Sequence, residues 1–155
     1  MEGDPDTTLV TEGEWKGWRV WRGLDPFEDL TGPFYLRQEP DGSVRCAFRA
    51  DRKHMNAAGF MHGGCLMTFA DYALFAIAHN HRERLGTPET SSGVTATLNG
   101  EFVSSVREGA LVEATGEVVR MGRSLIFLRG LITSSGEPLL TFSGLIKRVR
   151  RRERS

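Results

Sequence analysis

The sequence has few of the features that would narrow its function at once. Its 155 residues include two cysteines, too few for a disulfide framework, and we expect Cys46 and Cys65 to be small buried residues in a reducing cytoplasm. Lysine plus arginine and aspartate plus glutamate each number 20, so the formal net charge is zero. Nothing in this balance argues for a nucleic-acid partner, and we expect none.

Targeting segments and long hydrophobic runs are also missing. The start, "MEGDPDTTLV", is acidic and has no apolar run, so it predicts neither a signal peptide nor a transit peptide. The longest apolar stretch, residues 65–78, contains Asp71 and is too short to span a bilayer. We therefore expect a cytoplasmic protein with no membrane partner, folded as one domain.

The hydrophobic periodicity predicts an α+β fold. Two strand-like runs, 32–38 and 43–50, flank an Asp41-Gly42 turn signal. Residues 63–81 have a helical pattern that is apolar nearly all round, which is typical of a buried helix. Four further runs alternate like strands: 93–106, 109–122, 123–136 and 137–149. Their short connections favour an antiparallel sheet that curls around the helix.

The two ends of the chain differ from this pattern. Residues 1–31 show little hydrophobic periodicity. We expect them to form an extension that packs over the domain through its tryptophans, with a short helical turn around Trp15 and Trp18. The tail "KRVRRRERS" carries six of the twenty basic residues in nine positions. We expect a domain over 32–149 and a solvated basic tail over 150–155.

Asp71 is the only formally charged residue between His62 and His79. A desolvated carboxylate costs several kcal/mol unless it is paired or hydrogen-bonded. Two interpretations fit it: a structural aspartate bonded to a backbone donor, or a catalytic base or nucleophile whose reactivity gains from poor solvation.

A second polar feature, His62-Gly63-Gly64, stands where the helix is expected to begin. The first amides of a helix have no internal partner and can bind an anion or a developing oxyanion. Gly63 and Asp71 are eight residues apart, about 12 Å along a helix axis. Asp71 therefore cannot act on a carbonyl held at its own helix start, but it can act on one held by an antiparallel second copy. If the two features cooperate, the protein is a symmetric dimer with two sites.

The stretch "HMNAAGFMHGGCLMTFAD", with "GVTATLNGEFVSSVREGALVEATGEVVRMGRSLIFLRG" downstream, resembles the hotdog-fold thioesterases of the PaaI (phenylacetic acid degradation) type. The shared pattern is Asn56, then His-Gly-Gly six residues on, then Asp71 nine after the histidine, and the resemblance covers about 32–149. It implies a curved antiparallel sheet of five to six strands around one long helix. It also implies a homodimer, often a dimer of dimers, that hydrolyses acyl-CoA thioesters without a cofactor.

The resemblance also implies roles for single residues. The N–H of Gly63 would polarise the thioester carbonyl, and Asp71 of the other subunit would be the general base or nucleophile. Asn56 would hold the carbonyl or the water, Thr95 would orient the water, and His62 would support the turn or touch the substrate.

The expected substrate contacts form two groups. The first, beside the helix, comprises Gly64, Met61 and Tyr72. The second, in "RMGRS" and near the nucleotide of coenzyme A, comprises Arg120, Arg123 and Ser124. The two arginines fit equally well as solvated turn residues.

Several alternatives stay open from the residues. Cys65 at a helix start would have a lowered thiol pKa and could be a nucleophile. A metal site at "HNH" is not expected, because His79 and His81 point about 200° apart on a helix. The same fold could serve as a non-catalytic acyl-CoA binding module, or as a dehydratase or hydratase that pairs a histidine with an acid. A buried charge favours catalysis over binding alone.

Overall fold

The computed structural model describes residues 4–23, 25–87 and 91–150. Two α-helices and a short 3-10 helix connect eight strands. The helices are α1 (Pro26–Thr31), η1 (Arg52–His54) and α2 (Gly63–Leu85). The strands are β1 (Thr7–Leu9), β2 (Arg19–Trp21), β3 (Tyr35–Gln38), β4 (Val44–Arg49), β5 (Ser91–Phe102), β6 (Leu111–Met121), β7 (Leu125–Ser134) and β8 (Glu137–Arg150).

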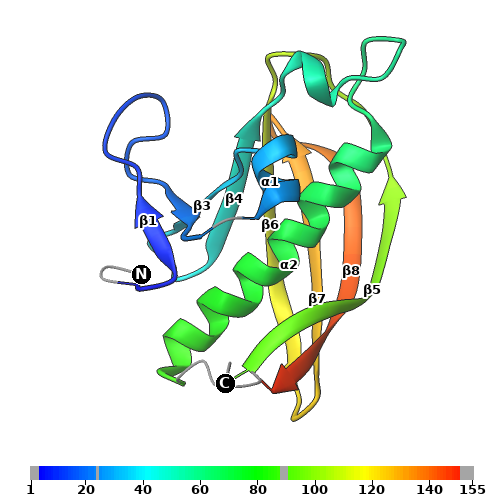
Figure 1. Cartoon of the computed structure of the whole chain (residues 1–155). Helices are drawn as coiled ribbons and strands as arrows, with labels where there is room; N and C mark the ends of the chain where they lie inside the picture. Colours follow the sequence, from blue (N-terminus) through cyan, green and yellow to red (C-terminus); the bar gives the residue numbers. More distant parts are fainter. Residues whose placement is uncertain (1–3, 24, 88–90, 151–155) are drawn as a thin grey trace.

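One antiparallel sheet holds all eight strands in the order β1-β2-β3-β4-β6-β7-β8-β5. It curves around α2, which lies along its inner face (Figure 1). The predicted fold class, a curved antiparallel sheet around one long helix, is therefore confirmed. The sheet has more than the expected five to six strands because the extension adds β1 and β2. With three residues each, these strands are too short to show a period in the sequence.

The long helix α2 starts and stops at signals in the sequence. His62 is its N-cap, and Gly86 ends it in the left-handed conformation, with its N–H bonded to the carbonyls of Arg82 and Glu83. The helix continues four residues past the predicted end at His81, since the polar stretch there consists of good helix formers and the first stop signal is Gly86. No helix in the described part of the chain has the length and continuous hydrophobicity that a bilayer span requires.

The core lies between α2 and the inner face of the sheet. Leu74 and Ile77 of the helix approach the strands so closely that glycine is needed opposite them. A Cβ on Gly144 would lie 2.5 Å from Leu74 Cδ1, and one on Gly116 would lie 2.6 Å from Ile77 Cδ1. These contacts fix the distance between helix and sheet, and with it the positions of the other helix side chains.

The strands β1 and β2 of the extension lie at the opposite edge of the sheet from β5. Its tryptophans contact the sheet: Trp15 stacks on Tyr35 with ring centroids 4.2 Å apart, and Arg37 lies over the ring of Trp18 at 4.4 Å. The expected helical turn is a single hydrogen-bonded turn, closed by the Trp18 N–H and the Trp15 carbonyl. Of the predicted tail 150–155, residues 151–155 lie outside the described residues.

Candidate active site

Asp71 lies in a groove of about 400 Å³ between α1, α2 and β5. The hydroxyl of Thr95 on β5 donates a hydrogen bond to Asp71 Oδ1 over 2.6 Å. The residues that line the groove are Asp25, Phe27, Glu28, Gly64, Met67, Thr68, Asp71, Thr95 and Leu98. Of the residues expected to act together, one protomer thus brings Asp71, Thr95 and Gly64 to the same groove.

A single stripe of α2 faces this groove. Gly64, Thr68 and Asp71 follow one another at spacings of four and three residues, so they lie on one face of the helix. In the protomer Asp71 is half-buried and not enclosed by the core. The predicted burial therefore holds for most of α2, whereas this stripe, which faces α1 and the edge strand β5, is only partly covered.

The pairing of β5 with β8 shifts register at the level of this groove. Thr95 is opposite Ile146 and Thr97 is opposite Leu145, so Ala96 is an extra residue on β5. A bulge of this kind re-aims neighbouring side chains. Here the bulge lies next to Thr95, whose hydroxyl points toward Asp71.

The start of α2 leaves one of its two glycine amides open. His62 Nδ1 accepts a hydrogen bond from the Gly64 N–H over 2.9 Å, whereas the Gly63 N–H has no acceptor among the described residues. A Cβ on Gly63 would lie 3.2 Å from the ring of Phe102 on β5, so this ring covers one side of the glycine. His62 therefore supports the turn, and Gly63 keeps a free donor at the positive end of the helix dipole.

Asn56 lies apart from Asp71 within one protomer. Its side-chain oxygen accepts hydrogen bonds from the N–H groups of Ala58 and Phe60, which closes the loop before α2. It lines a different hollow, of about 640 Å³, together with Arg52 and Arg107. One chain alone therefore does not bring Asn56 to the Asp71 groove.

Two of the expected substrate contacts are core residues. Met61 and Tyr72 are each 3% exposed, and the Tyr72 hydroxyl donates to the Phe34 carbonyl over 3.3 Å. Neither lines the Asp71 groove. Within one chain their side chains therefore pack inward from the helix and its preceding loop, and the contact with the substrate expected for them stays a prediction.

Arg120, Arg123 and Ser124 belong to the hairpin between β6 and β7, at the far end of the sheet from the start of α2 (Figure 1). All three are exposed, and none lines the Asp71 groove. The carbonyl of Ser124 accepts a hydrogen bond from the N–H of Arg148, which holds the hairpin against β8.

Comparison with known proteins decides the family. Residues 58–141 match the Thioesterase superfamily, which is more than half of the chain. The chain belongs to the thioesterase superfamily. It is 32% identical over 121 residues to a Pseudomonas aeruginosa protein named "Putative esterase PA0474", covering 77% of this chain and 86% of that protein.

Two further similar proteins agree with the assignment. The human protein named "Acyl-coenzyme A thioesterase 13" is 28% identical over 119 residues, 76% of this chain and 80% of that protein. A point mutant of the phenylacetic acid degradation protein PaaI from Thermus thermophilus has a similar fold, with a TM-score of 0.66 and 24% identity. The match covers 81% of this chain and 100% of that one. The resemblance to hotdog thioesterases of the PaaI type, and the class of reaction expected from it, are thereby confirmed.

In this thioesterase-superfamily chain, Cys65 is unsuited to be a nucleophile. Burial raises the pKa of its thiol to about 11, and the positive charge of Lys53 offsets only part of that effect. Cys46 is fully buried, and burial raises the pKa of its thiol well above the usual range. Neither thiol is therefore ionised near neutral pH.

Sequence reasoning missed the contribution of α1. Asp25 caps this helix by accepting from the Glu28 N–H over 3.1 Å, and Pro26 occupies its first turn. The helix brings Glu28 to the wall of the Asp71 groove. Burial first, and then the negative charges of Asp25, Asp71 and Asp29, raise the pKa of Glu28 to about 7. The "DPFED" stretch carried a helix-start signal, but nothing in it indicated where the helix would lie.

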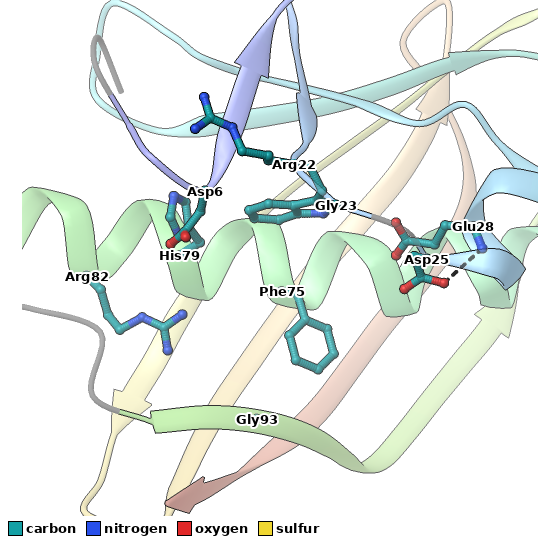
Figure 2. A pocket seen from close by; sticks show the side chains of 10 residues that line it. Asp6, Arg22, Gly23, Asp25, Glu28, Phe75, His79, Arg82 and Gly93 are labelled. Atoms are coloured by element: carbon teal, nitrogen blue, oxygen red, sulfur yellow. Dashed lines mark hydrogen bonds between the residues drawn. The ribbon is translucent and has the colours of Figure 1, made fainter. Parts of the chain in front are cut away.

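A second hollow, of about 490 Å³, adjoins the groove at Asp25 and Glu28 (Figure 2). It lies between the extension, α2 and the start of β5, with Trp21 and Phe75 as its aromatic walls. Several charged or ionisable side chains also line it: Asp6, Arg22, His79 and Arg82. The two hollows thus share Asp25 and Glu28 as lining residues.

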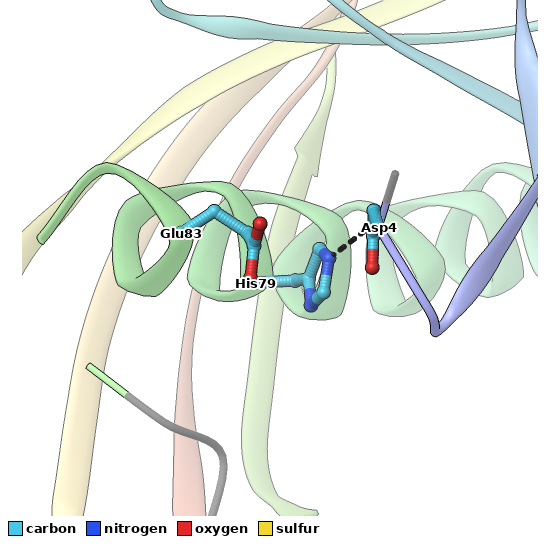
Figure 3. A group of neighbouring side chains, drawn as sticks. All are labelled: Asp4, His79 and Glu83. Carbon is cyan, nitrogen blue, oxygen red and sulfur yellow. Dashed lines mark hydrogen bonds and ion pairs between the residues drawn. The ribbon is translucent and has the colours of Figure 1, made fainter. Parts of the chain in front are cut away.

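His79 is part of the only group among the described residues with three neighbouring potential metal ligands. The ligand atoms of Asp4, His79 and Glu83 lie within 4.8 Å of one another (Figure 3). His79 Nε2 is 2.9 Å from Asp4 Oδ2, and Asp4 also accepts from the Thr7 hydroxyl and the Asp6 N–H. Both Asp4 oxygens thus have partners within the chain, and the contact with His79 ties the extension to α2.

The same contacts set the ionisation of Asp4. Burial alone would raise the pKa of this carboxyl, but the hydrogen bonds from Asp6, His79 and Thr7 outweigh it and lower the pKa below its ordinary value. Sequence reasoning compared His79 only with His81, and the partner from the extension could not be found from local spacing.

Proposed function

We propose that the protein hydrolyses acyl-CoA thioesters to a carboxylic acid and coenzyme A, with Asp71 as the general base or nucleophile. The observation that carries the proposal is the Asp71 carboxylate hydrogen-bonded by Thr95 in a groove on the exposed stripe of α2. The name of the human relative supports coenzyme A as the carrier of the acyl group.

The site takes residues from two copies of the chain. The Gly63 amide and Asp71 are about 12 Å apart along one helix, so a single chain cannot use both on one carbonyl. An antiparallel partner helix would bring the partner's Gly63 to Asp71, which makes a homodimer with two sites. Two dimers can associate further into a homotetramer.

The free edge of the sheet supports this dimer. β5 is the last strand of the sheet, and no other described strand pairs with its outer side. Three large apolar side chains on or next to it are about half exposed: Val94 at 50%, Phe102 at 56% and Val103 at 55%. An unpaired apolar edge is a template for pairing with another chain. Since Phe102 also covers Gly63, this edge and the open amide would enter the interface together.

The chemistry follows from these positions. The Gly63 N–H would stabilise the negative charge that develops on the thioester oxygen. Asp71 would take a proton from water or attack the carbonyl itself, and Thr95 would hold the carboxylate and orient the water. His62 would keep the turn in place, and Asn56 would reach the carbonyl or water of the partner's site. Coenzyme A is part of the substrate, so no cofactor or metal is needed.

A panel of acyl-CoA thioesters with aryl, short and long acyl groups tests the proposal. We expect Asp71→Asn to lower kcat by about 10³-fold, as expected for the loss of a base or nucleophile. Glu137→Gln, the same change of carboxylate to amide at the exposed first residue of β8, should leave kcat unchanged.

Three results would contradict the proposal: no thioester is cleaved above the uncatalysed rate, Asp71→Asn stays as active as wild type, or a monomer is fully active. Binding of acyl-CoA without cleavage would identify a binding module, and addition of water to an enoyl-CoA without cleavage would identify a hydratase.

A further inference from the structure

One wall of the Asp71 groove comes from the N-terminal extension. α1 and its cap contribute Asp25, Phe27 and Glu28 to the groove that holds Asp71 and Thr95. Glu28 also lines the neighbouring hollow, so it lies where the two spaces meet. Figure 2 shows the carboxyl groups of Asp25 and Glu28 close together beside α2.

α1 is capped at its start and tied to the body of the protein at its end. At its start, Asp25 accepts a hydrogen bond from the Glu28 N–H over 3.1 Å, which keeps the first turn helical. At its end, a ring nitrogen of the buried His54 lies 2.6 Å from the Thr31 carbonyl, and Lys53 donates to the carbonyl of Gly32. These contacts hold α1 in the position in which Glu28 lines the groove, as a residue that takes part in chemistry requires.

The surroundings of Glu28 favour its neutral form. Burial and the negative charges of Asp25, Asp71 and Asp29 raise the pKa of its carboxyl to about 7. The neighbouring hollow carries both signs of charge, from Asp6, Arg22 and Arg82. The Thr95 hydroxyl donates a hydrogen bond to the Asp71 carboxyl group, so the two carboxyl groups that line the groove lie in different surroundings. With its raised pKa, Glu28 keeps a substantial share of its proton near neutral pH.

We propose that Glu28 is a second catalytic carboxyl group of this site and that it gives its proton to the sulfur of the leaving thiolate. The inference rests on the proposed thioesterase function. Two neighbouring carboxyl groups in different environments, one neutral and one ionised, can divide the roles of acid and base between them.

Each carboxyl group returns to its starting protonation state over one turnover. Asp71 takes a proton from water as the hydroxide oxygen bonds to the thioester carbon. The tetrahedral oxyanion then reforms the carbonyl, the C–S bond breaks, and the sulfur takes the proton of Glu28. The products are the carboxylic acid and the free thiol, and the proton on Asp71 passes to the Glu28 carboxylate. If Asp71 attacks the carbon itself, Glu28 regains its proton from the water that cleaves the resulting anhydride.

The test compares two leaving groups on one acyl group. A coenzyme A thioester releases an alkyl thiolate that gains from protonation, whereas a nitrothiophenyl thioester releases a thiolate that is stable without a proton. We expect Glu28→Gln to lower kcat on the coenzyme A thioester by about 100-fold and to keep kcat on the aryl thioester within about threefold of wild type. The wild-type rate should fall above a pH of about 7, and this alkaline limb should be missing in the variant.

Two controls keep the test specific. Glu12→Gln makes the same change at an exposed position of the extension and should alter neither rate. Glu28→Asp keeps a carboxyl group and should retain the alkaline limb at a lower kcat, which separates proton donation from a purely structural role.

Equal losses on the two thioesters, or no loss on either, would overturn the inference. If the wild-type protein cleaves neither thioester, the proposed function fails and the inference with it. That outcome appears in the wild type alone, so it cannot be confused with a failure of the role of Glu28.

Discussion

The helix–sheet core and the N-terminal extension meet at the same groove but are held in place by different means. In the core, α2 packs against the sheet through fully buried side chains such as Phe69 and Leu74, and through the glycines that face them. The extension depends on a few separate contacts, among them Trp15 on Tyr35 and Asp4 on His79. A packed core gives positions that single substitutions barely move, whereas an element held by single contacts can be released by removing one of them.

The largest effect should come from the core, at the start of α2. Gly63→Pro removes the open N–H, while the extended backbone of His62 and the first helical position both accept a proline. We expect kcat to fall by about 10²–10³-fold, roughly the effect of losing one oxyanion donor. Gly63→Ala adds a similar Cβ beside Phe102 but keeps the N–H, so it should retain most of the activity.

Mixed dimers test whether each site takes Gly63 and Asp71 from different chains. In a dimer of one Gly63→Pro chain and one Asp71→Asn chain, one site has both changes and the other has neither. Random mixing of the two inactive variants should therefore restore about a quarter of the wild-type activity. If each site lies within one chain, mixing restores none.

The next largest effect concerns the packing of the core. Gly144→Ala would place a Cβ 2.5 Å from Leu74 Cδ1 and 2.8 Å from the Thr97 carbonyl oxygen. We expect the free energy of unfolding to fall by about 2–3 kcal/mol, measured by denaturant unfolding at fixed protein concentration. Ser143→Ala, on the exposed face of the same strand, should cost much less, and an equal loss would contradict the packing argument.

A smaller and local effect is expected in the extension. Asp4→Asn removes the charge that pairs with His79, in a contact buried on both sides. Amide hydrogen exchange in β1 and β2 should become about tenfold faster, while protection in α2 stays unchanged. Equal changes in both regions would show that the extension and the core unfold as one unit.

The ionisation of Glu28 gives a pH-dependent stability effect. Its native pKa of about 7 lies above the ordinary value of 4.5, so the native state binds more protons than the unfolded state between these pH values. The contribution of the Glu28 proton to the free energy of unfolding is fully present below the ordinary pKa of 4.5 and is lost as the pH rises through about 7. Because the group is partly exposed, we expect Glu28→Gln to melt only about 2–4 °C above wild type at pH 8, and at the same temperature near pH 4. The same difference at both pH values would exclude Glu28 as the titrating group.

The smallest effect belongs to the hairpin between β6 and β7. If Arg120 and Arg123 attract the phosphates of coenzyme A, replacing both by glutamate should raise KM about threefold at low salt and leave kcat unchanged. The increase should disappear at high salt, since exposed charges are screened. An unchanged KM at low salt would identify them as solvated turn residues.

The larger elements could be predicted from the sequence, and the short ones could not. The period of α2 and the alternation of β4 to β8 report burial against a core, which is a regular property of the chain. The two strands of the extension have three residues each, and their positions depend on contacts with distant segments. Residues as far apart as Asp4 and His79 have no local spacing that would indicate their contact.

The candidate site follows the same division. The PaaI-type pattern singled out Asp71 and Thr95, and the two side chains are hydrogen-bonded in the structure. The wall formed by Glu28 was missed because a six-residue helix with a readable cap can dock on any apolar surface. The burial of Met61 and Tyr72 in the core of the protomer could not be predicted, because apolar side chains near a site look alike in sequence, whether they face a ligand or the core.

Two buried histidines attach the two ends of the extension to the rest of the protein. His79 binds its beginning at Asp4, and His54 binds its end at Thr31, so the segment between them is fastened to the body of the protein at both extremities. Neither contact touches the groove, yet both tie the segment that carries Glu28 to the body of the protein. A chain cut between these two contacts should therefore loosen the wall of the groove without altering any residue that lines it.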